Sequence, residues 1–103
     1  MGKNSDIESI SNSISKTILH EILVDYTNRL ESINHIRKEE IEYRWQSIKK
    51  INKINLNDKD KKVIRNKVIR KIKNRLKTKY SDVVVSQEII TQKVDEELYF
   101  FFQ

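Results

Sequence analysis

The fold is decided by residues 7–30, IESISNSISKTILHEILVDYTNRL, in which an apolar side chain returns at every fourth position. Of the residues midway between these positions, Asn12, Lys16, His20 and Asn28 are polar and Val24 alone is apolar, so the period is that of a helix and not of a strand. Ser5-Asp6-Ile7-Glu8 has the S-x-x-E pattern of a helix N-terminus. We therefore expect a helix over residues 6–34. Its apolar stripe is Ile10, Ile14, Ile18, Ile22, Tyr26 and Leu30.

Two later segments repeat the same spacing, with Asn57 or Asp58 and then Ser86 as candidate N-caps. They predict helices over 58–79 and 86–101. Between them and the first helix, a segment with acidic residues near its start and basic residues near its end predicts a helix over 35–54. The expected buried positions of these three helices are Ile64, Val68, Ile72, Leu76 and Tyr80, then Ile90, Val94, Leu98 and Phe102, and for 35–54 Ile41, Trp45, Ile48 and Ile51.

Composition and spacing together predict one all-α domain spanning residues 1–103. With one Gly and no Pro in 103 residues, the chain lacks the turn formers of a many-stranded β fold. A stripe that advances by four drifts by about 40° per turn, which favours helices crossing at inclined angles. We expect about four inclined helices, not an extended coiled coil.

Charge is segregated along the chain. Residues 1–58 carry nine basic and nine acidic residues, residues 59–79 carry eleven basic residues against Asp60, and residues 80–103 carry Lys93 against five acids. The net charges are 0, +10 and −4, which sum to the +6 of the whole chain. The helix over 58–79 is thus strongly basic, and the helix over 86–101 is acidic and ends in aromatic residues.

The basic helix predicts a nucleic-acid or ribonucleoprotein binding module that contacts the phosphate backbone. Lys outnumbers Arg on it, which suits phosphate contact better than base reading, and DNA and RNA stay equally open. The residues expected to bind are those farthest from the apolar stripe, namely Lys59, Lys67, Arg70, Lys71, Lys73 and Lys77.

The terminal aromatic run supports an alternative function. Four consecutive aromatic residues point all round a helix, so a partner surface would have to cover part of them. The alternative is therefore a protein-interaction subunit or inhibitor, a homo-oligomer or part of a hetero-complex, that docks through its C-terminus and turns the basic helix to an acidic protein surface. A basic amphipathic helix lying on anionic lipid is a third hypothesis. The expected interface is Tyr99, Phe100, Phe101 and Phe102.

Other functional classes lack support in the sequence. No acid, base and nucleophile can be named together, so we expect no enzyme, and no residue pattern indicates a metal or cofactor. No apolar run approaches the roughly 18 residues of a membrane span. The absence of Cys fits a reducing compartment, so we expect an intracellular protein, cytoplasmic or nuclear.

Overall fold

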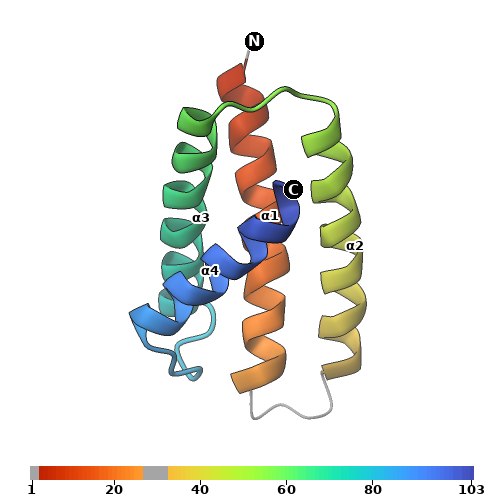
Figure 1. Cartoon of the computed structure of the whole chain (residues 1–103). Coiled ribbons are helices and arrows are strands. Elements are labelled where there is room, and N and C mark those ends of the chain that lie inside the picture. Colours follow the sequence, from red (N-terminus) through yellow and green to blue (C-terminus); the bar gives the residue numbers. More distant parts are fainter. Residues whose placement is uncertain (1–2, 27–32) are drawn as a thin grey trace.

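Four α-helices make up the chain in the computed structural model, which describes residues 3–26 and 33–103. They are α1 (Lys3–Tyr26), α2 (Ile33–Asn52), α3 (Asp58–Thr78) and α4 (Gln87–Phe101), and the described residues contain no strand (Figure 1). The predicted all-α architecture is confirmed.

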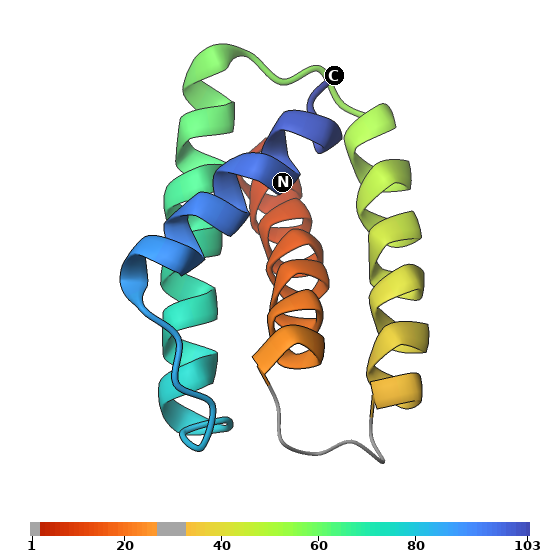
Figure 2. The same cartoon turned by 60° about the horizontal axis from the view of Figure 1, so that its bottom comes forward.

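Helix α1 lies at the centre of the fold. Helices α2 and α3 run alongside it on opposite sides, and α4 crosses it diagonally (Figures 1 and 2). The molecule measures 39 × 25 × 24 Å, so it is not an extended coiled coil. The inclined crossing predicted from the four-residue stripes is seen for α4, whereas α1 to α3 run alongside one another.

The core forms where α1, α3 and α4 turn their stripes towards one another. Ile14, Ile18 and Val68 have no exposed surface at all. Burying one such side chain stabilises the fold by about 1.5–3 kcal/mol. Three predicted stripes are therefore confirmed, and the buried apolar residues they supply are Ile10, Ile14, Ile18, Ile22, Ile64, Val68, Ile72, Leu76, Ile90, Val94 and Leu98.

Small hydroxyl side chains complete the buried surface of α1. The hydroxyl of Ser11 donates to the carbonyl of Ile7 at 2.7 Å, and that of Thr17 to the carbonyl of Ser13 at 2.9 Å, so both buried groups are satisfied within the helix. The Ser13 hydroxyl accepts from Lys50 of α2 at 2.7 Å. Helix α2 thus meets α1 partly through polar contacts.

The prediction for the buried face of α2 is wrong. Trp45 is 62% exposed and Ile41 is 56% exposed, whereas the fully buried residue of this helix is Ser47. Ile48 is also exposed, and Ile51 is partly buried. The physical reason is that the polar side of α2 faces the hydroxyl-rich side of α1, which leaves the stripe of Ile41, Trp45 and Ile48 in solvent.

Helix boundaries differ from the predicted ones at several points. Ser5 lies inside α1 and not at its N-cap, and the predicted break at Asn34–His35 falls within α2, which begins at Ile33. Tyr26, expected in the stripe, is 41% exposed, and Leu30 lies outside the described residues.

The predicted caps of the last two helices are confirmed. Asn57 caps α3 in a reciprocal capping box, in which Asn57 Oδ1 accepts from the amide of Asp60 at 2.8 Å and the Asp60 carboxylate accepts from the amide of Asn57. Ser86 caps α4 by accepting from the amide of Ile89 at 3.2 Å.

Candidate nucleic-acid interface

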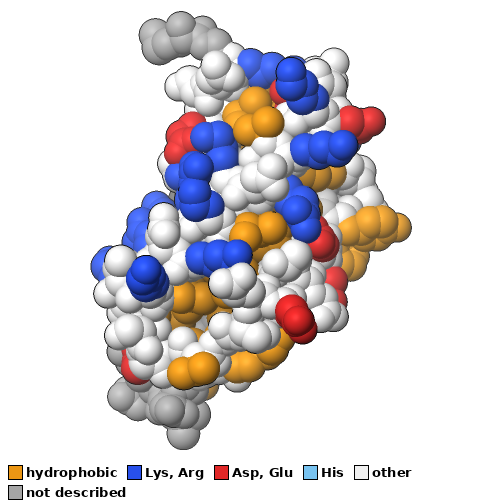
Figure 3. Space-filling model, turned by 90° about the vertical axis from the view of Figure 1, so that its left-hand side faces the viewer, with side chains coloured by type: hydrophobic (Ala, Val, Ile, Leu, Met, Phe, Trp, Pro, Cys, Tyr) orange, Lys and Arg blue, Asp and Glu red, His pale blue; other side chains and the backbone are white. Residues whose placement is uncertain are grey.

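The solvent side of α3 is the strongest candidate surface. Because Ile64, Val68 and Ile72 anchor this helix in the core, residues half a turn away point outward. Figure 3 looks onto this side of the molecule and shows Lys and Arg side chains spread over it, with hydrophobic atoms between them and few acidic groups. We name the basic residues of this side that have no carboxylate partner among the described residues the α3 basic face: Lys59, Lys62, Arg70, Lys73 and Lys77.

Two of the predicted binding residues are paired within the fold. Lys67 and Lys71 contact the carboxylate of Glu8 on α1, at 2.8 Å and 2.6 Å. Their hydrogen bonds lower the pKa of Glu8 to about 2, so this carboxylate stays ionised at neutral pH. Lys67 and Lys71 are therefore partly neutralised, while the other four predicted residues belong to the α3 basic face.

Lys62 was missed by the sequence interpretation. It is exposed and lies three residues after Lys59 on the same side of α3. The neighbouring cations have partners in the fold. Arg65 makes two contacts with Asp95 of α4, at 2.6 Å and 3.2 Å, and the ammonium of Lys61 lies 5.6 Å from the ring centroid of Phe102. Lys62 differs from Lys61 and Arg65 in its position around the helix and in having no such partner.

Of the C-terminal aromatic residues, one is buried, one is partly buried and two are exposed. Phe101 is 8% exposed and belongs to the core, with the Arg44 guanidinium 5.5 Å from its ring centroid, and Phe102 is partly buried. Tyr99 and Phe100 are each 67% exposed. Of the four residues expected at a partner interface, two are thus open to a partner, because the chain's own core takes up the others.

A groove joins the aromatic end of α4 to the basic helix. Its volume is about 410 Å³, and its lining combines Lys61, Lys62 and the paired Arg65 and Asp95 with the rings of Tyr99 and Phe102. Cations and an exposed ring side by side suit a ligand that carries both negative charge and a flat or apolar group.

A cluster of charged side chains fastens α4 to α1 and α2. Arg44 of α2 contacts Glu97 of α4 at 2.9 Å and Glu40 at 2.9 Å. Burial and a hydrogen bond with Glu97 raise the pKa of Glu21 on α1 to about 8. The pKa of Glu97 is lowered: burial opposes this shift, but the hydrogen bonds with Glu21 and Arg44 outweigh it. One proton is thus held on Glu21 between the two carboxyl groups at neutral pH.

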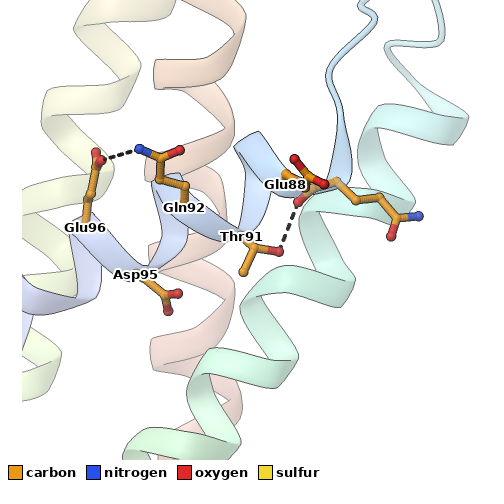
Figure 4. A pocket seen from close by; sticks show the side chains of 6 residues that line it. Glu88, Thr91, Gln92, Asp95 and Glu96 are labelled. Carbon is orange, nitrogen blue, oxygen red and sulfur yellow. Dashed lines mark hydrogen bonds between the residues drawn. The ribbon is translucent and has the colours of Figure 1, made fainter.

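The outer side of α4 is acidic and forms no enclosed site. Glu88, Asp95 and Glu96 lie there with Gln92, whose amide donates to Glu96 at 3.2 Å (Figure 4). All the lining residues belong to one helix, so this is an open surface.

Nothing in the described residues gathers three or more metal-ligating side chains into a group that could hold an ion. Glu39 instead lies between two histidines, at 3.0 Å from His20 and in contact with His35.

Across residues 3–26 and 33–103, no helix is long and apolar enough to cross a membrane. Comparison with models of protein families finds no match, and neither do comparisons with curated proteins and with solved structures. The chemistry of the chain's own residues therefore carries the functional proposal.

Proposed function

We propose that the protein binds nucleic acid, or a ribonucleoprotein, through the sugar-phosphate backbone, with the α3 basic face as the contact surface. The observation that supports this is the row of five cations without carboxylate partners among the described residues. From Lys59 to Lys77 the row extends over 18 residues, or about 27 Å at 1.5 Å per residue, which is long enough to meet several phosphates. With such a partner, we propose an intracellular location.

The chemistry of the face favours binding without base readout. Four of its five cations are lysines, which contact phosphate as point charges, and phosphate contacts position a protein without specifying a sequence. The protein then acts by binding and not by catalysis. Duplex DNA and structured RNA both present suitable backbones.

The test is the salt dependence of binding to a DNA duplex, to a structured RNA and to a single strand of equal length. Five phosphate contacts predict a slope of log affinity against log salt of about −4.5 for the DNA duplex and about −3.5 for the single strand. A flat response for all three would remove the proposal.

Two variants that remove the same amount of charge test whether binding depends on the α3 basic face or only on the net charge of the protein. Arg70→Gln with Lys77→Gln removes two cations of the face, and should reduce the duplex slope by about 1.8. Arg37→Gln with Lys53→Gln removes one Arg and one Lys from exposed positions of α2 and the turn that follows it, and should leave the slope unchanged. Equal effects of the two variants would contradict the assignment of the surface.

A second candidate function is supported by the exposed rings of Tyr99 and Phe100. A protein partner with an acidic surface could cover these rings and pair with the nearby cations Lys61 and Lys62. Purification of the protein with its partners, with and without nuclease treatment, distinguishes the two functions. Nucleic acid lost on treatment supports the first function, whereas a stoichiometric acidic protein that survives treatment supports the second.

A further inference from the structure

Helix α2 presents an apolar stripe that no other part of the described chain covers. Ile41, Trp45 and Ile48 are 56%, 62% and 37% exposed, and their spacing of four and then three residues places them on one side of the helix. We name these three residues the α2 apolar stripe. A spacing of four and three is the pattern by which one helix packs along another in a coiled coil.

Two charges of opposite sign flank the middle of this stripe, and the exposed Lys38 lies on the same edge one turn before the first of them. Glu42 and Lys49 are both exposed, and neither has an ion-pair partner in the part of the chain that the structure describes. They are seven residues apart, so both lie on the same edge of the stripe, about two turns from each other. Trp45 lies between them along the helix.

We propose that the α2 apolar stripe binds the same stripe of a second copy of this chain, with the two α2 helices antiparallel and related by a two-fold axis. In this arrangement, Trp45 of one copy packs on Ile48 of the other. Because the two helices run in opposite directions, Glu42 of each copy then lies beside Lys49 of the other. A two-fold interface repeats every contact, so two ion pairs form from one pair of residues.

The charges of α2 favour this arrangement over a parallel one. In a parallel pair, the coiled-coil pattern would bring Arg44 of one copy towards Lys49 of the other, and like charges at such positions oppose association. In the antiparallel register, Arg44 instead lies near Ile51 of the second copy. The partner that matches both the apolar stripe and its charged edge is thus a second α2.

The dimer leaves the α3 basic face free. Helices α2 and α3 lie on opposite sides of α1, so a second copy on α2 does not cover α3. Three apolar side chains per copy make an interface below the standard size of about 800 Å² per partner, so we expect weak association in the micromolar range.

Trp45 supplies the first readout. As the only Trp of the chain, it reports directly on the interface. Between about 1 µM and about 500 µM, its emission should shift to shorter wavelength as the mass measured by sedimentation doubles. Trp45→Glu should stay monomeric over this range, with an unchanged circular dichroism spectrum because the position is exposed in the monomer.

Charge reversal supplies the decisive test. Glu42→Lys and Lys49→Glu should each weaken the dimer at least about tenfold, because each places two like-charged pairs in the interface, and the double variant should restore the wild-type affinity. Tyr99→Glu, at an exposed aromatic residue of α4, should leave the dimer unchanged. A wild-type monomer at all concentrations, a dimer that survives Trp45→Glu, or a double variant no stronger than the single ones would each overturn the proposal.

Discussion

Replacing Glu21 by Gln should remove a pH dependence from the stability of the fold. In the folded protein, burial and the hydrogen bond with Glu97 keep the proton on Glu21 up to about pH 8, whereas in the unfolded chain this group ionises near 4.5. Between these values the folded state binds more protons than the unfolded state. The free energy of unfolding therefore falls as the pH rises through this window.

The size of the effect follows from the two pKa values. They differ by about 3.5 units, and at about 1.36 kcal/mol per unit the limit is about 5 kcal/mol. The attraction of Lys93 and Arg44 is already contained in this pKa, but the Glu21 side chain is 26% exposed, so screening by water reduces the penalty of ionisation further. We expect about half of the limit, about 2–3 kcal/mol. The Gln amide can donate to Glu97 as the protonated carboxyl group does, so the variant should match the wild type near pH 5.

Urea denaturation followed by circular dichroism between about pH 5 and about pH 8 measures this difference. Tryptophan emission is less suitable, because Trp45 is already exposed in the folded monomer. Glu88→Gln, at an exposed carboxylate of α4, is the control and should leave the slope unchanged. Identical pH slopes for the wild type and Glu21→Gln would refute the idea that Glu21 holds the proton, and so would an equal loss of stability by the variant at both pH limits.

Three other changes test the binding surface and the packing. Glu8→Gln releases Lys67 and Lys71, so the salt slope of duplex binding should steepen by up to about 1.8, and an unchanged slope would show that these lysines do not reach phosphate. Ile72→Ala should cost about 2–5 kcal/mol in urea denaturation, because its side chain is fully buried; a loss below 1 kcal/mol would argue against this packing. Ser86→Ala should cost about 1 kcal/mol, and Ser86→Asn, which can still cap, should restore most of it.

Apolar periodicity predicted three helices correctly because their stripes are the core. Ile14, Val68 and Val94 lie at predicted positions and are all buried. The same reasoning failed for α2, where Trp45 is exposed and Ser47 is buried. Periodicity indicates which residues share a side of a helix, and it does not indicate whether another element covers that side. Which side of α2 is covered depends on polar contacts with α1, and the pattern of apolar residues gives no information on these contacts.

The basic character of α3 could be predicted from the sequence, but which of its cations pair with carboxylates could not. Lys67 and Lys71 meet Glu8 across more than 55 residues of chain, and only the packing of α3 on α1 brings them together. The aromatic terminus shows the same limit, because the core accommodates Phe101 and leaves Phe100 exposed. Neighbouring residues of the same type thus differ in burial and in partners, because the elements that contact them are distant in the sequence.

The central position of α1 has a consequence for biosynthesis. Its residues leave the ribosome before those of the other three helices, but the stripe that covers Ile14 and Ile18 arrives with α3, which begins at Asp58. Until then the nascent chain can offer α1 only α2, whose contacts with α1 are partly polar and whose apolar contribution to the core is limited to partly buried residues such as Ile36 and Ile51. A chain that ends before α3 therefore leaves a row of isoleucines exposed to water, and such a chain is prone to aggregate or to bind a chaperone. The fold forms only once nearly all of its residues have been made.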